Sequence, residues 1–302
     1  MIEVQNITKT YEKGKILAVE DASFSVQKGE LFGLIGPDGA GKSSLFRILT
    51  TLLLADSGNA MVDGLDVRKD YKKIRQSVGY MPGKFSLYQD LTIEENLNFF
   101  ATIFNTTIAE NYDLIHDIYV QIEPFKDRRA GKLSGGMKQK LALCCALIHK
   151  PTVLFLDEPT TGVDPVSRKE FWEMLKRLKE KDITILVSTP YMDEAALCDR
   201  IALIQKGKIL QIDSPEHISA TYPYDLFAIR ANKMSKLLQS LHTYPELNSA
   251  FAFGEYIHIS VENNTLDTQK LIDFLQENEM KDIEIKPIKP NVEDVFIHLL
   301  KQ

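Results

Sequence analysis

A glycine-rich run that follows an apolar stretch constrains this chain's fold more than any other feature. Residues 31–35 (LFGLI) are apolar throughout, and a helical pattern starts at residue 42. The run between them comprises Gly36, Pro37, Asp38, Gly39, Ala40, Gly41, Lys42, Ser43 and Ser44. Glycines let backbone N–H groups curl around phosphate oxygens, and a helix N-terminus adds positive potential. The pattern predicts a nucleotide-phosphate loop in which Lys42 reaches the β- and γ-phosphates and Ser43 ligates Mg²⁺.

Length and composition place the chain among folded proteins of about two domains. It has 302 residues, 44% of them hydrophobic and 26% charged, which is close to the average for globular proteins. Its 36 basic and 42 acidic residues give a net charge of −6, so no nucleic-acid partner is expected. The apolar stretches fall well short of the ~18 residues that span a bilayer, and no export signal is recognised. Any membrane association is therefore expected to be through a partner.

The three cysteines point to a reducing environment. Cys144 and Cys145 are adjacent, and Cys198 stands alone. This spacing fits neither a disulfide framework nor a set of metal ligands. The cysteines are expected to be buried thiols in a reducing compartment.

Apolar strands alternate with amphipathic helices in the first two thirds of the chain. Strands are expected at 2–7, 22–26, 31–35, 78–81, 153–156 and 183–188, and helices at 42–53, 94–104, 135–149 and 167–180. Continuous apolar strands interleaved with helices predict an α/β fold with a parallel sheet covered on both faces. The stretch of about 84–150 is largely helical and is expected to form a long insertion between core strands.

The chain changes character near Ser214–Pro215. Residues 221–302 show a strand, a helix, two strands, a helix and a strand, and then a helix from Val292. This βαββαβ order predicts a C-terminal α+β accessory domain with a ferredoxin-like fold. Two domains are therefore expected, at 1–220 and 221–302.

Two acids end one of the predicted core strands. Asp157 and Glu158 follow the apolar residues 153–156. A carboxylate at this position can hold Mg²⁺, and its neighbour can polarise an attacking water. Together with the phosphate loop, the pair predicts nucleotide hydrolysis, with Asp157 as a metal ligand and Glu158 as the catalytic residue.

A second serine–glycine motif precedes the predicted helix at 135–149. Ser134, Gly135 and Gly136 lie within LSGGMKQ, and a serine with glycines at a helix N-terminus predicts another phosphate-facing site. The segment PTTGVD follows the two acids and ends at Asp164. With these motifs in this order, residues 1–220 resemble the ATP-binding subunit of an ABC transporter. The resemblance implies a P-loop NTPase core of the ABC ATPase type with a helical subdomain at about 84–150.

The resemblance also implies a dimer with two composite sites. In the family, two ATPase domains pair head to tail, and each ATP lies between the phosphate loop of one chain and the serine–glycine signature of the other. The signature of this chain would therefore contact ATP held by its partner. Tyr11 matches the aromatic residue that stacks on adenine, and Asp164 matches the loop that crosses the dimer interface. ATP and Mg²⁺ are the implied cofactors.

Two further segments resemble those of exporters. The family's helical subdomain grips cytoplasmic helices of integral membrane permease subunits. LYQDLTIEENL at 87–97 is similar to the version in exporters whose permeases are separate chains, and KPNVEDVF at 289–296 looks like the closing helix of drug-resistance exporter subunits. The resemblance implies an energising subunit at the cytoplasmic face of the cell membrane, held there by its permease subunits.

Two positions depart from the family's pattern. At the first, the family has proline and then a glutamine that contacts Mg²⁺ and the attacking water, whereas here Pro82 is followed by Gly83. At the second, the family has a histidine that hydrogen-bonds the γ-phosphate, whereas here Thr189 is followed by Pro190. Neither glycine nor proline can supply such a side-chain contact. Losing one oriented contact to a developing charge commonly costs about 10² to 10³ in rate.

The departures predict a chain whose own site binds ATP but hydrolyses it slowly. Glu158 is retained, which argues against a fully inactive site. A heterodimer with a second ATP-binding subunit that carries the glutamine and the histidine is favoured, and a homodimer is possible. Alternatively, Lys84, Thr189 or ordered water could replace the missing contacts.

Two other functions stay open at this point. The first is a soluble ABC-type ATPase without a permease, acting in translation or DNA repair, although such relatives usually carry two cassettes or a long coiled coil in one chain. The second is a chiefly regulatory subunit, whose output is nucleotide binding rather than turnover. Export of a drug-like, lipid-like or polysaccharide-related compound is suggested only by the resemblance.

Overall fold

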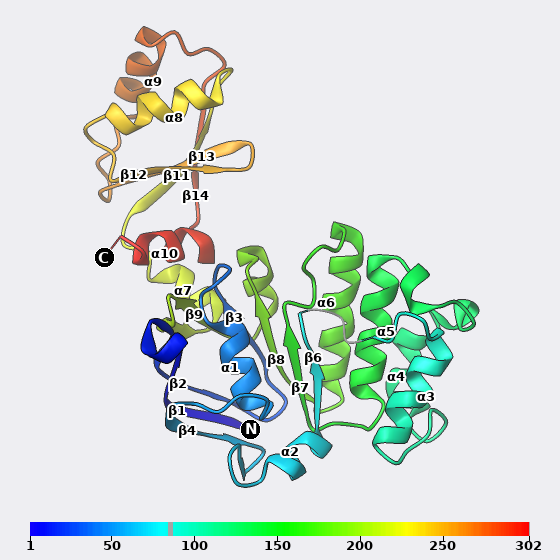
Figure 1. Ribbon diagram of the computed structural model, residues 1–302. Helices are drawn as coiled ribbons and strands as arrows, with labels where there is room; N and C mark the ends of the chain where they lie inside the picture. The colour runs from blue at the N-terminus through cyan, green and yellow to red at the C-terminus, as the bar shows by residue number, and fades with distance from the viewer. Residues whose placement is uncertain (84–86, 302) are drawn as a thin grey trace. The chain divides into compact units, whose positions relative to one another are not determined.

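The structure is a computed structural model that describes residues 1–83 and 87–301 (Figure 1). It divides into two compact units, Met1–Glu216 and His217–Gln302. Within the described ranges, no helix combines the length and the hydrophobicity needed to cross a membrane. Lys84, one of the suggested substitutes for the missing contacts, lies outside the described residues.

A largely parallel sheet forms the centre of the first unit. Its strands are β3 (Leu31–Ile35), β6 (Val78–Met81), β7 (Val153–Asp157), β8 (Thr184–Thr189), β9 (Arg200–Gln205) and β10 (Lys208–Asp213). They lie in the order β10-β9-β3-β8-β7-β6, and only β10 pairs antiparallel in this sheet. Every residue of β3, β7 and β8 is buried, as expected for strands covered on both faces. The four core strands predicted from the sequence are confirmed.

An antiparallel sheet packs beside the first helix. It contains β1 (Ile2–Tyr11), β2 (Ile16–Val26), β4 (Ser57–Val62) and β5 (Leu65–Asp66), in the order β2-β1-β4-β5. Helix α1 (Lys42–Leu49) lies between the two sheets, and its buried Phe46 meets Phe155 of β7 edge-on, with ring centroids 6.0 Å apart. The prediction that this helix continues to residue 53 is wrong. Thr51 has a φ of 65°, a left-handed conformation that ends the helix early.

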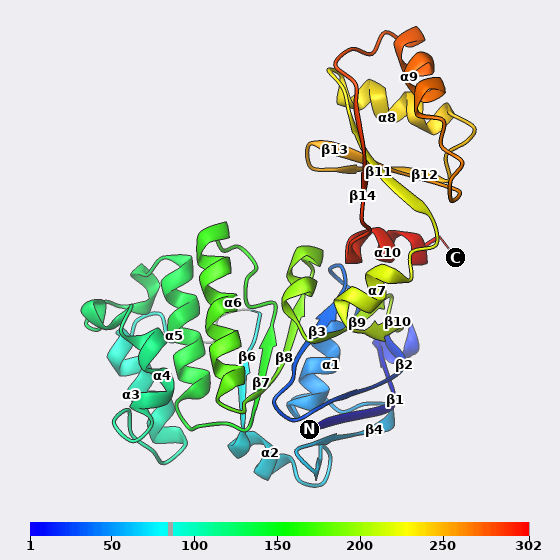
Figure 2. The ribbon, with the colours of Figure 1, turned by 180° about the vertical axis from the view of Figure 1, so that it is seen from behind.

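Helices occupy most of the insertion between β6 and β7. They are α3 (Ile93–Ile103), α4 (Tyr112–Tyr119), η2 (Glu123–Phe125), η3 (Ala130–Lys132) and α5 (Gly135–Leu147). Helices α3, α4 and α5 gather on the side of the sheet where β6 and β7 lie, as both views show (Figures 1 and 2). Thr92 and Glu95 form the reciprocal capping box expected at the start of α3. Outside the insertion, α2 (Tyr71–Ser77) precedes β6, and α6 (Pro165–Glu180) packs on β3 and β8.

The second unit has its own core. After α7 (Pro215–Ala220), its elements are β11 (Asp225–Arg230), α8 (Met234–Thr243), β12 (Ser249–Phe253), β13 (Tyr256–Val261), α9 (Thr268–Glu277), β14 (Glu284–Ile288) and α10 (Val292–Leu299). The strands form an antiparallel sheet in the order β12-β13-β11-β14. Leu237 of α8 and Leu271 of α9 are buried in one cluster with Ile257 and Ile259 of β13. The two helices therefore cover one face of this sheet.

All three cysteines are free and buried, and burial raises the pKa of each thiol. Because the thiolate is the reactive form, we expect Cys144, Cys145 and Cys198 to react with a thiol reagent at pH 8 at least about 100-fold more slowly in the folded protein than in guanidinium. The measurement is the absorbance of the released thiolate over time. A Ser235→Cys variant, with its thiol at an exposed position of α8, is the control that should react fast, and a rapidly reacting wild-type protein would contradict the burial.

Candidate nucleotide-binding site

The glycine-rich run joins β3 to α1 at the carboxyl end of the parallel strands. Gly41 has a φ of 106°, and a Cβ there would lie 2.2 Å from the carbonyl oxygen of Ala18. A Cβ at Gly36 would lie 2.1 Å from the carbonyl oxygen of Ile204. Only glycine fits at these two positions, so the loop is held tightly against neighbouring backbone. Lys42 folds back over it and donates to the carbonyl oxygens of the loop's first two residues, at 2.7 and 3.0 Å.

The two acids at the end of β7 meet the loop. Asp157 Oδ1 accepts hydrogen bonds from the hydroxyls of Ser43, at 3.1 Å, and Ser188, at 2.7 Å. Glu158 Oε1 lies 3.0 Å from Lys42 Nζ, in an ion pair whose lysine side chain is only 2% exposed and whose glutamate side chain is 23% exposed. The structure therefore brings the predicted phosphate-binding, metal-binding and catalytic side chains together at one place. Parallel pairing of β7 with β8, and of β8 with β3, aligns the strand ends that carry them.

Glu158 has an unusual backbone. Its φ is 51°, and its N–H donates to both the carbonyl oxygen and the hydroxyl of Ser188, at 3.1 and 3.0 Å. Left-handed backbone at a residue other than glycine is uncommon and needs support from its surroundings. These hydrogen bonds hold the turn that aims the Glu158 carboxylate at the loop.

Tyr11 lies beside the same loop. It ends β1, is partly exposed, and its hydroxyl is 3.1 Å from the Ser44 hydroxyl. The ammonium of Lys9 is 5.8 Å from the centre of its ring. The structure thus places an aromatic ring next to the phosphate-binding residues.

The serine–glycine signature begins α5. Ser134 caps the helix, because its hydroxyl accepts from the N–H of Met137 at 3.3 Å. A Cβ at Gly136 would lie 2.7 Å from Ser167 Oγ of α6, so glycine allows these helices to approach closely. In the described part of the chain, no hydrogen bond or ion pair joins Ser134, Gly135 or Gly136 to residues 36–44. The structure does not bring the signature to the chain's own phosphate loop.

Gln139 was not predicted from the sequence as a site residue. It lies on α5, is 1% exposed, and donates through Nε2 to the carbonyl oxygen of Pro159, directly after Glu158. In the sequence Gln139 stands between two lysines, so nothing local marks it as a buried residue. It links α5 to the segment that follows Glu158.

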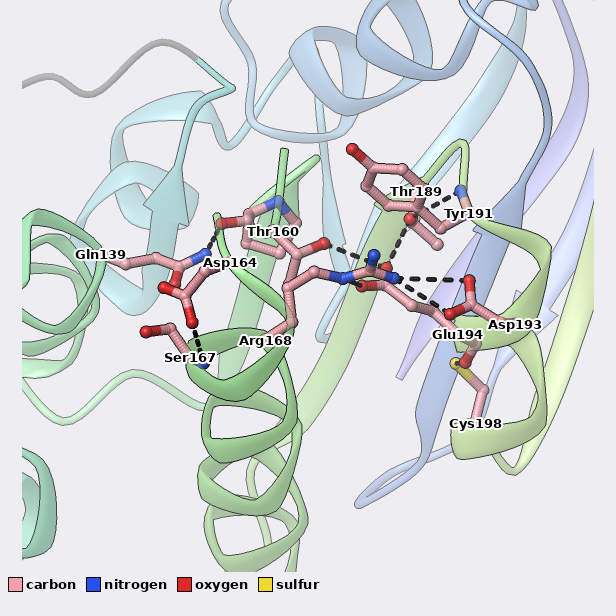
Figure 3. Close-up of polar contacts among 11 residues, drawn as sticks. Gln139, Thr160, Asp164, Ser167, Arg168, Thr189, Tyr191, Asp193, Glu194 and Cys198 are labelled. Atoms are coloured by element: carbon pink, nitrogen blue, oxygen red, sulfur yellow. Dashed lines mark hydrogen bonds and ion pairs between the residues drawn. The ribbon is translucent and has the colours of Figure 1, made fainter. Parts of the chain in front are cut away.

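Asp164 begins α6. Its Oδ1 accepts from the N–H of Ser167 at 3.0 Å, and this hydrogen bond lowers the pKa of the carboxyl (Figure 3). Pro165 occupies the first helical position, where its missing N–H costs nothing. The cap therefore sets where the loop that precedes α6 ends.

Gly83 lies beside the two acids, and Thr189 lies at the end of β8. A Cβ at Gly83 would lie 3.1 Å from the carbonyl oxygen of Asp157 and 3.9 Å from Glu158 Cβ. A longer side chain at this position would therefore reach the acids. Thr189 is fully buried, and its hydroxyl donates to Glu194 at 2.5 Å and accepts from the N–H of Tyr191 at 3.1 Å. The single donor of the Thr189 hydroxyl is therefore used by Glu194 in this structure.

Several known proteins are similar in sequence to this chain. A family model described as "ABC transporter" matches residues 19–161. The linearmycin resistance ATP-binding protein LnrL of Bacillus subtilis (strain 168) is 39% identical over 215 residues, which are 70% of this chain and 68% of that protein. The probable multidrug ABC transporter ATP-binding protein YbhF of Escherichia coli (strain K12) is 41% identical over 222 residues, which are 73% of this chain and 38% of that protein. The chain thus spans well under half the length of YbhF.

Solved structures share the arrangement of the larger unit's elements. CbiO1 from Clostridium perfringens, part of the ABC transporter complex cbiONQ, matches with a TM-score of 0.64 and 26% identity, over 73% of this chain and 90% of that one. A dimeric ATP-binding cassette bound to ADP and phosphate matches with a TM-score of 0.64 and 25% identity, over 71% of this chain and 98% of that one. Both likenesses cover most of the solved protein.

Proposed function

The chain belongs to the ABC transporter family, and we propose that it is the ATP-binding and ATP-hydrolysing subunit of a membrane exporter whose permease is formed by other chains. The observation that carries this proposal is the meeting of Lys42 and Ser43 with the two acids that end β7. A cation, a hydroxyl and two carboxylates around a phosphate loop are the groups that phosphoryl transfer to water needs. The printed names of the relatives, which include multidrug transport, linearmycin resistance and Nod factor export, support export.

The oxygen atoms of Ser43 and Asp157 suit a hard divalent cation. They lie 3.1 Å apart, and Mg²⁺ prefers oxygen ligands. Ser43 and Asp157 would hold this ion, which would neutralise negative charge on the transferred phosphoryl group. Ser188 keeps Asp157 oriented for that role through its 2.7 Å hydrogen bond.

Lys42 and Glu158 exchange partners when ATP binds. Phosphate oxygens compete for the ammonium that pairs with Glu158 at 3.0 Å. Once Lys42 binds phosphate, the Glu158 carboxylate is free to accept a proton from the water that attacks the γ-phosphate. Tyr11, beside Ser44, would stack on the adenine.

A second ATPase chain completes each site. The separation of the signature from residues 36–44 in the described chain supports a head-to-tail dimer, in which Ser134, Gly135 and Gly136 contact the partner's ATP. Asp164 then lies in the loop that crosses the interface. The helical insertion would bind the permease, and this binding would hold the chain at the cytoplasmic face of the membrane. No nucleic-acid partner is proposed.

The partner chain is proposed to carry the glutamine and the histidine that are missing here. Gly83 leaves the space beside Asp157 and Glu158 without a side chain, and Pro190 offers no donor. The chain's own site would therefore turn ATP over slowly, while its signature completes an efficient site on the partner. This asymmetric heterodimer is favoured over a homodimer.

Restoring both side chains tests the asymmetric site. In a Gly83→Gln/Pro190→His variant of the full chain, we expect ATP turnover to rise by at least about 100-fold, because even one oriented contact is commonly worth about 10² to 10³ in rate. Released phosphate is measured, together with the Kd for ATP, which should change by less than about threefold. Adding Glu158→Gln to this variant is the control, since it should abolish the gain. Wild-type turnover that already equals that of the double variant would argue for a competent homodimer.

Co-purification distinguishes the transporter subunit from the other candidate functions. The tagged chain is recovered from gently solubilised membranes of its native cells. Membrane subunits together with a second ATP-binding chain would support the heterodimer, and membrane subunits with this chain alone would support the homodimer. Recovery without any membrane protein would favour the soluble ATPase, whereas tight ATP binding with slow exchange and little turnover would favour the regulatory subunit.

The second unit is proposed to be an accessory domain with a ferredoxin-like fold. Its βαββαβ order, the antiparallel sheet with β11 and β13 at the centre, and two helices on one face support this assignment. It carries none of the groups that we assign to ATP chemistry. A role in stabilising the dimer or in sensing a ligand would fit such a domain.

A further inference from the structure

A buried carboxylate lies in the segment that follows β8. Glu194 is 2% exposed and belongs to the 3₁₀ helix η4 (Met192–Leu197). Its Oε2 accepts from the hydroxyls of Thr160, at 3.0 Å, and Thr189, at 2.5 Å, and its Oε1 accepts from Arg168 Nε at 3.1 Å (Figure 3). Burying a carboxylate is costly unless it is paired and hydrogen-bonded. Here both oxygens are used, so the group is fixed in one orientation.

Arg168 is held from three sides. Its Nη2 lies 3.2 Å from Asp193 Oδ2, its Nε binds Glu194, and its guanidinium lies 4.2 Å from the centre of the Tyr191 ring. A planar guanidinium can make these contacts at the same time, whereas a lysine ammonium cannot copy their geometry. Arg168 also lies on the first turn of α6, four residues after Asp164. These contacts therefore tie the first turn of α6 to Tyr191, Asp193 and Glu194.

The Glu194 carboxylate connects three segments that are far apart in the sequence. Thr160 follows Glu158 by two residues, and Thr189 ends β8 directly before Pro190. Arg168 adds the helix that Asp164 caps. One carboxylate thus joins the turn that bears the catalytic acid, the loop that lacks the histidine, and the loop assigned to the dimer interface.

We propose that Glu194 and Arg168 are positioning residues for ATP hydrolysis, whose ion pair holds Glu158 in register with Asp164. The inference rests on the roles proposed above for Glu158 and Asp164. Because charge-assisted hydrogen bonds are short and directional, a displacement of the Asp164 loop is passed through Arg168 and Glu194 to Thr160 and the turn at Glu158. Contact with a partner at Asp164 thereby controls the orientation of the catalytic carboxylate.

The test compares Glu194→Gln with a control variant that breaks a different ion pair made by α6. Glutamine keeps the shape of Glu194 but removes the charge that binds Arg168. We expect kcat for ATP in the full chain to fall about 10- to 100-fold, because misplacing a catalytic group by about 1 Å can cost about 100-fold. The KM for ATP should stay within about twofold, since residues 36–44 are untouched.

Glu170→Gln is the control. Glu170 pairs with Lys140 at 2.9 Å and so also ties α6 to another element, but among the described residues no hydrogen bond or ion pair joins either side chain to Thr160, Thr189 or Glu194. We expect its kcat to stay within about twofold of wild type. The Tm of both variants is measured, and Arg168→Lys provides a second, milder disruption of the same ion pair in case Glu194→Gln does not fold.

Three results would overturn the inference. The first is a kcat unchanged in Glu194→Gln and in Arg168→Lys, the second is a fall matched by Glu170→Gln, and the third is a change in KM without a change in kcat. A wild-type chain that hydrolyses no more ATP than its Glu158→Gln variant would overturn the proposed ATPase function as well. If only the positioning role is wrong, the wild-type chain hydrolyses ATP and the variants without the ion pair hydrolyse it at the same rate.

Discussion

Replacing Glu158 with glutamine is expected to reduce ATP turnover by about 1,000-fold, which lies within the 10² to 10⁴ that a positioned general base contributes. Glutamine has nearly the same shape but cannot accept a proton from the attacking water. The measurement is the rate of phosphate release under saturating Mg·ATP.

ATP binding should not weaken along with turnover. Glu158 pairs with the buried Lys42 at 3.0 Å, so a phosphate group must compete with this carboxylate for the ammonium. Removing the negative charge should leave the Kd for ATP unchanged or lower, as measured with a fluorescent ATP analogue. A loss of turnover without weaker binding would separate a catalytic role from simple damage to the fold.

Glu173→Gln is the control for this experiment. It removes one exposed carboxylate from α6 and should leave both turnover and binding within about twofold of wild type. If Glu158→Gln keeps wild-type turnover, another group activates the water and the assignment of Glu158 is wrong.

Replacing Gly41 with alanine is expected to weaken ATP binding by about 100-fold or more. The φ of 106° is unfavourable for alanine, and the added Cβ would lie 2.2 Å from the carbonyl oxygen of Ala18. Backbone strain of this kind costs up to about 3 kcal/mol, and about 1.4 kcal/mol corresponds to tenfold in affinity. Because Ala18 belongs to β2, the strain can be relieved only by moving the loop or the strand.

Gly64→Ala is a matched control. Gly64 also has a positive φ, of 77°, but nothing lies within 4 Å of its added Cβ. Alanine there should cost about 1 to 2 kcal/mol of stability and leave the Kd for ATP unchanged. Circular dichroism is measured on both variants. Equal ATP affinity of Gly41→Ala and Gly64→Ala would show that the close contact with Ala18 is not needed for the loop.

Most of the fold could be predicted because its signals are local. The apolar runs of β3, β7 and β8 carry the continuous pattern of doubly covered strands, and Thr92 with Glu95 marks the start of α3. The end of α1 was misplaced, because the helical pattern continues through residues whose backbone is turned by Thr51. The hydrophobic periodicity of a sequence does not reveal a single residue with left-handed backbone.

Gln139 and Glu194 could not be assigned roles in the same way. Each is an ordinary polar residue in the sequence, and only burial and partners distinguish it: Gln139 reaches the carbonyl of Pro159, and Glu194 binds Thr160, Thr189 and Arg168. The hydrogen bond from the Thr189 hydroxyl to Glu194 could likewise not be predicted from the sequence.

The phosphate loop, the acids after β7 and the motif before α5 could all be predicted from the sequence, because the residues that form each of them are neighbours along the chain. Which of these groups meet depends on how the chain packs. The hydroxyl of Ser43 and the carboxylate of Asp157, 114 residues apart, come within 3.1 Å, whereas no bond joins the signature to the loop in the described residues. The physical reason is that parallel strand pairing aligns distant strand ends at one edge of a sheet, and local sequence contains no measure of that alignment.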